Sequence, residues 1–254
     1  MSMEDFERDR DDVVRRASER GVSFVEVGFD VESSVKAVSL ARRLRGKCTV
    51  GIHPGSVPPS RDGLAGAWKQ VEALLDDNPE IAAIGEIGLD FSRGRSAEVV
   101  QVECFAMGLA LARKKGLPVV IHQRDAAREV LCAVKDLGTP QPAVFHCFTG
   151  DRDYAARCLD LGGYLGLGGI LTFPKNIDLR ETVRYLPRDR ILLETDSPYL
   201  APQSQRGKRN EPSFVTEVRD LVAGLLGLPA ASVSEMTAAN ASRAFLAELA
   251  TPGK

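Results

Sequence analysis

The sequence predicts one α/β domain over residues 1–254, in which parallel strands alternate with helices. The length and a hydrophobic share of 44% suit a single large core, and the length is ordinary for a (β/α)8 barrel. Short apolar runs alternate with helical stretches at intervals of roughly 25–35 residues, which is typical of right-handed βαβ units. Several of these runs end in a histidine or an acidic residue, as strands do at the catalytic face of a barrel.

The first elements follow from local spacing. Residues 4–20 carry apolar side chains at helical intervals on a charged background, and this pattern stops at Gly21. The run VSFVEV at 22–27 predicts a strand, and an amphipathic helix follows over 32–45 and ends before Gly46. The apolar run at 47–53 predicts the next strand, which ends at His53.

The same alternation continues along the rest of the chain. The run at 81–84 follows Asn78-Pro79, reads as a strand buried on both faces, and leads to Glu86. Further strands are predicted over 117–122, 143–146, 164–167 and 191–196. Helices are predicted over 64–76, 97–115, 125–137, 152–161, 179–185, 214–226 and 233–249.

These segments make one strand fewer than a closed barrel has, because the chain opens on a helix. A parallel barrel without its first strand would leave the strands at 22–27 and 191–196 with unpaired edges. We therefore expect either an open sheet or a further segment of about eight to twelve residues before Met1.

Polar side chains that can bind metals follow five of the predicted strands. A carboxylate such as that of Glu86, at the end of an apolar strand, must be paired, protonated or bound to a cation. A single histidine in such a place is more often a satisfied core residue, but all three histidines of the chain lie at strand ends. The set consists of His53, Glu86, His122, His146 and Asp196.

This set predicts a metal-dependent hydrolase. Imidazole and carboxylate ligands suit Zn²⁺, Mn²⁺ and similar ions. Glu86, between two strands that end in histidine, can bridge two cations, an arrangement that serves phosphodiester or amide hydrolysis. Asp196 can bind a metal and accept the proton of the attacking water. Glu194 either orients its neighbours or forms a salt bridge inside the barrel.

Composition limits the other functions. The net charge is −2, so no global basic field recruits nucleic acid, although bound metals can neutralise a phosphodiester locally. The five cysteines form no CxxC pair and no run approaches the roughly 18 apolar residues of a membrane span, so we expect a cytoplasmic protein that does not enter a membrane. Phosphate contacts are expected from Arg124 and from the basic loop with Arg206, Arg209 and Asn210, unless these are merely solvated.

At these residues the chain resembles the TatD family of metal-dependent hydrolases, a deoxyribonuclease branch of the amidohydrolase-like barrels. The resemblance implies a (β/α)8 barrel with two divalent cations (Mg²⁺, Mn²⁺ or Zn²⁺) and, as partner, DNA that is single-stranded or offers a 3′ end. Glu86 would bridge the metals, His122 and His146 would bind one of them, and Asp196 would bind the other and act as base; His53 and Glu194 would support these ligands. The matching segments are GIHP (51–54), IGEIGLD (84–90), IHQRDA (121–126), FHCFTG (145–150), LETDSPYLAP (193–202) and RGKRNEP (206–212).

One departure from the family concerns its first strand, which ends in a His-x-His pair that is absent from this sequence. The strand count and the missing pair both point to an N-terminus without that strand, so the expected number of bound ions is two, as in the family, or only one. The family implies a 3′–5′ exodeoxyribonuclease, and we expect a monomer. The alternatives are an aminoacyl-tRNA deacylase or other ester or amide hydrolase on the same site, or an impaired barrel that only binds nucleic acid or a partner.

Overall fold

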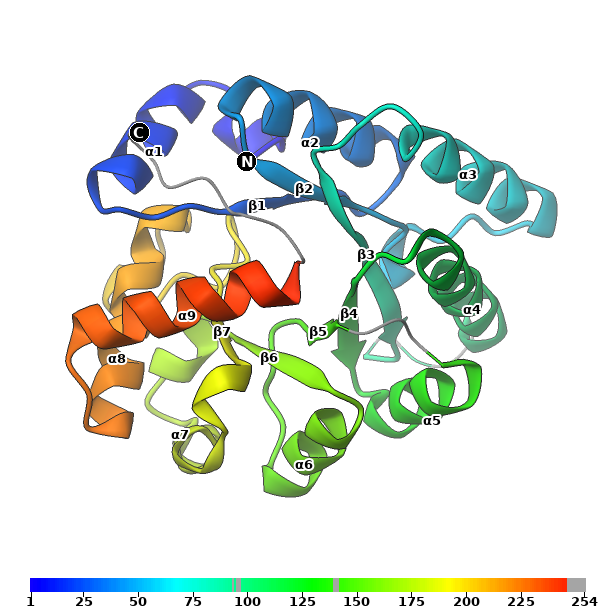
Figure 1. Cartoon of the computed structure of the whole chain (residues 1–254). Coiled ribbons are helices and arrows are strands. Elements are labelled where there is room, and N and C mark those ends of the chain that lie inside the picture. Colours follow the sequence, from blue (N-terminus) through cyan, green and yellow to red (C-terminus); the bar gives the residue numbers. More distant parts are fainter. Residues whose placement is uncertain (93, 95–96, 139–141, 246–254) are drawn as a thin grey trace.

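Seven parallel strands form the centre of the protein, in the order β1-β2-β3-β4-β5-β6-β7 (Figure 1). The computed structural model describes residues 1–245 except 93, 95–96 and 139–141. Each strand pairs in parallel with the next one along the chain. The strands are β1 (Val25–Val27), β2 (Lys47–Val50), β3 (Ile81–Asp90), β4 (Val119–Arg124), β5 (Ala143–Phe145), β6 (Gly163–Leu167) and β7 (Ile191–Leu193).

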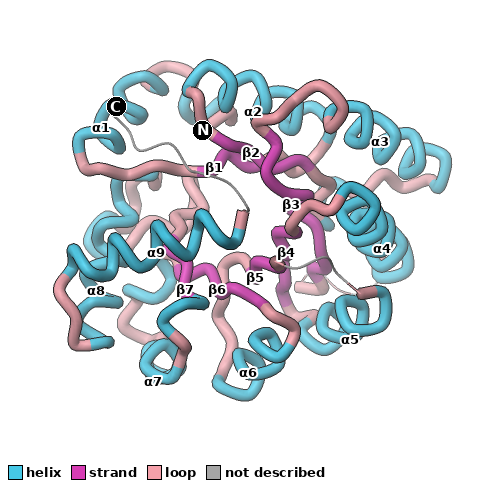
Figure 2. Tube along the Cα trace, in the orientation of Figure 1, coloured by secondary structure: helices cyan, strands magenta, loops and turns pink. Residues whose placement is uncertain are grey.

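Helices cover the outer face of the curved sheet (Figure 2). Their apolar stripes and the outward-facing strand residues form the main core, which includes Trp68, Phe105 and Phe145. The helices are α1 (Arg10–Glu19), α2 (Val31–Leu44), α3 (Arg61–Leu74), α4 (Glu98–Lys115), α5 (Ala127–Leu137), α6 (Arg152–Asp160), α7 (Ile177–Tyr185), α8 (Val215–Leu226) and α9 (Ala230–Ala244). Short 3-10 turns lie at Glu4–Phe6, Pro54–Ser56, Gly169–Thr172, Arg188–Arg190, Gln203–Gln205 and Pro212–Phe214.

A second, smaller core lies on the inner face of the sheet. Val120, Tyr164 and Leu192 point inward there and pack with Ala244 near the end of α9. Helix α9 crosses the open side of the sheet (Figure 1), and its last turn therefore fills the interior below the strand ends. This packing leaves only the C-terminal ends of the strands for polar chemistry.

The predicted α/β architecture with seven parallel strands is confirmed, including the missing strand of a full barrel. Among the described residues, β1 and β7 are the two edges of the sheet and do not pair with each other. The first predicted helix divides into the turn Glu4–Phe6 and α1. The last one was expected to reach residue 249, and residues 246–249 lie outside the described part of the chain.

The extents of the two strands that lead to Glu86 and Asp196 differ from the prediction. Strand β3 continues past Glu86 to Asp90, so Glu86 lies within the strand and not at its end. The pairing of β3 with β4 shifts between Ile84 and Ile87 and then continues to Asp90 and Arg124. Strand β7 instead ends at Leu193, which leaves Glu194 and Asp196 in the following loop. In the continuation of β3 the buried residues Ile87 and Leu89 alternate with Glu86, Gly88 and Asp90, so the unbroken apolar run ends early and this part of the strand is not predicted.

Gly88 allows the long β3–β4 pairing that places His122. It lies opposite His122 in the register and has φ of +145°, a conformation that side chains other than glycine rarely adopt. A Cβ atom at this position would collide with the carbonyl oxygen of His122.

In the described part of the chain no single helix is long and apolar enough to cross a membrane. A sharply bent pair of helical segments, Pro212–Leu226 and Ala230–Ala244, meets that test by length and composition alone.

Candidate metal centre

The carboxylate of Glu86 lies at the centre of the candidate site, and the three histidines surround it. Its Oε1 atom lies 2.8 Å from Nδ1 of His122 on the neighbouring strand β4. The Nε2 atom of His53, in the turn after β2, is 3.9 Å from the same oxygen, and so is Nε2 of His146, directly after β5. All three histidines of the chain therefore converge on one carboxylate oxygen.

A second group of side chains gathers around His146. Its Nδ1 lies 3.0 Å from Oε2 of Glu194, and its Nε2 lies 3.5 Å from Oδ1 of Asp196. The other oxygen of Glu194 accepts a hydrogen bond of 2.7 Å from the backbone N–H of Cys147. Both oxygens of this carboxylate are therefore held in place. Asp196 has φ of +58°, a left-handed conformation that costs free energy and is typical of functional turns.

The ionisation of these groups is strongly coupled. Burial by itself would raise the pKa of Glu86, but the charge of His146, the hydrogen bond with His122 and the charges of His122 and His53 together lower it to about 2. Burial lowers the pKa of His53 despite the charge of Glu86. Burial opposes the charged form of His146 too, yet Glu194, Glu86 and Asp196 raise its pKa well above the ordinary value. The site without a cation thus holds a proton on His146 that a metal would displace.

Asp90 belongs to the site although the sequence interpretation gave it no role. It lies four residues after Glu86 on β3, and its Oδ2 is 3.4 Å from Nε2 of His122. Its Oδ1 accepts hydrogen bonds from the backbone N–H and the hydroxyl of Ser92. Residues i and i+4 on a strand share a face, so the alternation Glu86-x-Gly88-x-Asp90 was the signal that could have identified it.

The predicted catalytic and metal-binding residues lie together in the structure. Glu86, His122, His146 and Asp196 form one connected cluster, and Glu194 contacts His146 as a supporting residue. The predicted supporting residue His53 lies closer than that role implies, because a ring nitrogen of His53, a ring nitrogen of His122 and a carboxylate oxygen of Glu86 can all reach one cation.

The four predicted substrate contacts fall into two pairs. Arg124, the last residue of β4, is exposed and lines an open groove, and Arg206 is exposed and stacks over the ring of Phe173 at 4.6 Å. Arg209 is instead engaged by Asp9, and Asn210 is fully buried in hydrogen bonds to the backbone of the loop after β7. Arg209 and Asn210 are therefore occupied by contacts within the protein and not by phosphate. Their partners lie about 200 and about 15 residues away in the sequence, so the local motif did not reveal them.

The residues present fit a divalent cation. Ligands about 2 Å from a metal lie about 3–4 Å from one another, which is the spacing of the ring nitrogens around Glu86 Oε1. The Nε2 atom of His122 is buried and lacks a hydrogen-bond partner among the described residues, and a buried nitrogen of this kind calls for a partner such as an ion. Imidazoles and carboxylates are ligands of Zn²⁺ and Mn²⁺.

Comparison with known proteins agrees with this geometry. A family model described as TatD related DNase matches residues 1–246. The chain belongs to the TatD family. A TatD-family relative in Erwinia billingiae, the 3′-5′ ssDNA/RNA exonuclease TatD, is 38% identical over 249 residues, which is 94% of each chain. The uncharacterized metal-dependent hydrolase YabD of Bacillus subtilis is 34% identical over 250 residues, which is 96% of each.

Solved structures of TatD proteins have the same fold. The crystal structure of YJJV, a TatD homologue from Escherichia coli K12, matches with a TM-score of 0.90 and 27% identity, over 96% of this chain and 95% of that one. The phosphotriesterase homology protein of Escherichia coli matches with a TM-score of 0.65 at 17% identity, over 92% of this chain and 88% of that one, a likeness of fold alone. This TatD-family chain is therefore a metal-dependent hydrolase with an α/β barrel-like fold.

Gly166 tests the role of Glu194 in this TatD-family site. A Cβ atom at Gly166 would overlap Oε2 of Glu194, the atom that contacts His146. We expect Gly166→Ala to displace this carboxylate and to lower hydrolytic activity about 10–100-fold, as loss of an outer partner of a metal ligand does. Gly224→Ala in α8 is the control, because a Cβ meets no atom within 4 Å there. Equal activity of both variants in steady-state assays would show that Glu194 does not position His146.

The coupled pKa values predict how the stability of the metal-free protein depends on pH. Glu86, lowered from its ordinary pKa of 4.5, stabilises the fold above that pH, and this contribution is lost as the pH falls toward about 2. His146, raised above its ordinary pKa of 6.5, stabilises the fold below that pH and ceases to do so as the pH rises through its raised value. His53, whose pKa is lowered from the same ordinary value of 6.5, acts in the opposite sense, because its contribution is lost as the pH falls below 6.5. We therefore expect the free energy of unfolding, measured with urea in EDTA, to be highest near pH 6.5 and to fall on either side. A curve that keeps rising to pH 9 would contradict this coupling.

Proposed function

We propose that this TatD-family protein removes nucleotides from the 3′ end of single-stranded DNA by divalent-metal-dependent hydrolysis of phosphodiester bonds. The proposal is supported above all by one observation, the convergence of four carboxylates on three imidazoles. The carboxylates are those of Glu86, Asp90, Glu194 and Asp196. Such a site repels a phosphodiester unless cations neutralise it, and it concentrates those cations.

Each residue then has a distinct task. Glu86, His53 and His122 would hold one cation, and His146 and Asp196, which lie beside Glu86, would be ligands of a second. A bound divalent cation supplies charge neutralisation of the phosphate oxygens and activation of water. Glu194 keeps the ring of His146 in the orientation needed for binding, through its contact of 3.0 Å. Asp196 accepts the proton of the attacking water.

The surroundings of the site favour a nucleic acid substrate over a small ester. An open groove begins where β4 ends, two residues beyond His122, and its lining includes Arg124 and Arg128 together with the carboxylates of Asp125 and Glu129. Arginine side chains in such a groove bind phosphate oxygens along a strand. The relative named as a 3′-5′ ssDNA/RNA exonuclease supports the same class of substrate.

A direct test uses a 5′-labelled single-stranded oligonucleotide with Mn²⁺. We expect a ladder of labelled products that shortens from the 3′ end, no cleavage in EDTA, and protection by a 3′-terminal block. A D-aminoacyl-tRNA serves as the comparison substrate for ester hydrolysis. Deacylation without cleavage of DNA, or no hydrolysis of either substrate with Mg²⁺, Mn²⁺ or Zn²⁺, would refute the proposal.

A further inference from the structure

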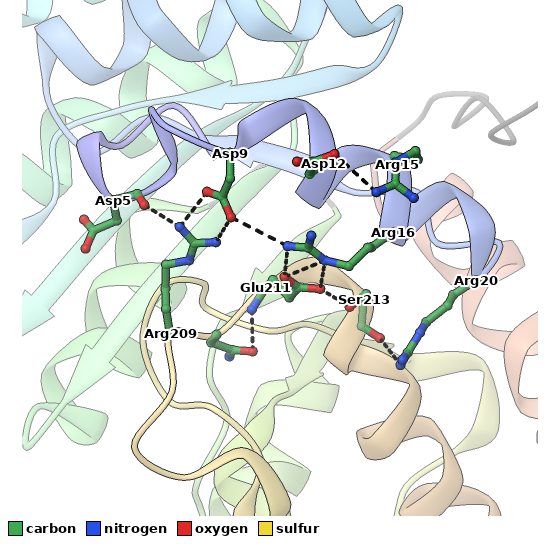
Figure 3. Close-up of polar contacts among 10 residues, drawn as sticks. Asp5, Asp9, Asp12, Arg15, Arg16, Arg20, Arg209, Glu211 and Ser213 are labelled. Atoms are coloured by element: carbon green, nitrogen blue, oxygen red, sulfur yellow. Dashed lines mark hydrogen bonds and ion pairs between the residues drawn. The ribbon is translucent and has the colours of Figure 1, made fainter.

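Four charged side chains form a cluster between α1 and the loop that follows β7 (Figure 3). We call this cluster the ionic clasp; it consists of Asp9, Arg16, Arg209 and Glu211. Two of its members precede or lie in α1, and the other two belong to the basic loop that the sequence analysis singled out. The clasp therefore joins segments about 200 residues apart in the sequence.

The clasp is built from two bidentate ion pairs. Arg16 contacts both carboxylate oxygens of Glu211, at distances of 2.6 to 3.1 Å, and Arg209 contacts both oxygens of Asp9 at 2.8 and 2.6 Å. Arg16 also lies 3.7 Å from Asp9, which links the two pairs. The side chain of Glu211 is only 7% exposed, so its charge depends on Arg16 for compensation.

Glu211, the buried residue of the clasp, is connected through Asn210 to the turn that carries Asp196. The backbone N–H of Glu211 donates to Oδ1 of the adjacent Asn210, whose side chain is fully buried. The amide group of Asn210 donates to the carbonyl oxygens of Thr195 and Tyr199, at 2.7 and 2.6 Å. These two carbonyls flank Asp196, so Asn210 holds both ends of the turn that carries this carboxylate.

The turn that carries Asp196 needs support because of its position in the fold. Asp196 follows β7, an edge strand with no pairing partner on one side among the described residues. Its backbone is in a left-handed conformation that does not persist without external support. The clasp connects this loop to α1, which directly precedes β1, the other edge strand.

We propose that the ionic clasp positions Asp196 against His146 by anchoring Asn210, so that Asp9, Arg16, Arg209 and Glu211 are positioning residues for metal binding. This inference rests on the proposed function in so far as Asp196 is a metal ligand. None of the four side chains contacts the cluster around Glu86. Their effect is transmitted through the backbone of the turn and not through their own charge.

The test compares Arg16→Gln with Arg15→Gln. Arg15 is the adjacent residue on α1 and forms two exposed pairs, with Asp12 and Glu19, so both variants lose one positive charge and their ion pairs on the same helix. Hydrogen exchange in EDTA reports the turn, because the N–H of Tyr199 donates to the carbonyl of Asp196. The N–H of Ile84, which donates to Pro118 between β3 and β4, serves as the internal reference for global opening.

We expect exchange at Tyr199 to become about tenfold faster in Arg16→Gln, with Ile84 unchanged and both amides unchanged in Arg15→Gln. The apparent affinity for Mn²⁺ should fall about tenfold in Arg16→Gln, as for other residues that support a metal ligand. In an Asp196→Asn background the same change should cause no further loss, because both substitutions then act on one ligand.

The outcomes separate the two proposals. Equal acceleration at Tyr199 and Ile84 would mean that the clasp contributes only to overall stability, and unchanged exchange at Tyr199 would mean that it does not hold the turn; either result overturns the inference. A full additional loss of Mn²⁺ affinity in the Asp196→Asn background overturns it as well. If the wild-type protein binds no Mn²⁺, the proposed function fails together with the role of the clasp in metal binding, whatever the exchange data show.

Discussion

Replacing Glu86 by Gln should lower the rate of phosphodiester hydrolysis by about 10³-fold, because the site loses the anionic oxygen on which all three imidazoles converge. The amide keeps the size of the side chain and one neutral oxygen, but it has no negative charge to balance a bound cation. The loss should be equally large for a long oligonucleotide and for a small chromogenic phosphodiester, since the defect lies at the reacting bond and not in the groove.

The matched control for Glu86→Gln is Glu72→Gln on α3, which removes an exposed pair with Lys114. Both variants change one carboxylate to an amide, so a difference between them reflects the site. The measurements are kcat and KM at saturating Mn²⁺, with unfolding by urea as a check on the fold. Activity of Glu86→Gln within tenfold of the wild type would exclude Glu86 as the central ligand.

Asp196→Asn should lower kcat by about 10²–10⁴-fold, the range expected for loss of a general base. Asparagine keeps the size of the side chain, but it binds a cation much more weakly than a carboxylate does and cannot accept the proton of the attacking water. The KM for an oligonucleotide should change little, because the substrate phosphates contact other residues. Steady-state kinetics with Asp220→Asn as control decides the point, since Asp220 is an exposed residue paired with Arg219 on α8. A large rise in KM with unchanged kcat would assign Asp196 to substrate binding instead.

The fold could be predicted from the sequence because buried parallel strands appear as apolar runs. Each predicted run corresponds to one strand, and the opening helix before residue 22 correctly indicated the missing strand. The convergence of the histidines could be anticipated for the same reason, since the C-terminal ends of parallel strands meet at one face. The second half of β3 is not an unbroken apolar run, because Ile87 and Leu89 alternate with Glu86, Gly88 and Asp90, and Asp90 was therefore not recognised.

The basic loop shows what a local motif does not reveal. Arg206, Arg209 and Asn210 are close together in the sequence and all suited to phosphate, but only Arg206 is exposed. Arg209 pairs with Asp9 and Asn210 bonds to the backbone around Asp196. These partners depend on how α1 packs against the loop after β7, a long-range contact that no spacing rule supplies.

The most direct test of the central claim is a crystal structure of the protein with Mn²⁺, using anomalous scattering to locate the ions. Our interpretation predicts an anomalous peak within ligand distance of Glu86 Oε1 and of a ring nitrogen of His122 or His146. Phosphodiesterase activity of the same preparation, with no ion at Glu86, would contradict it.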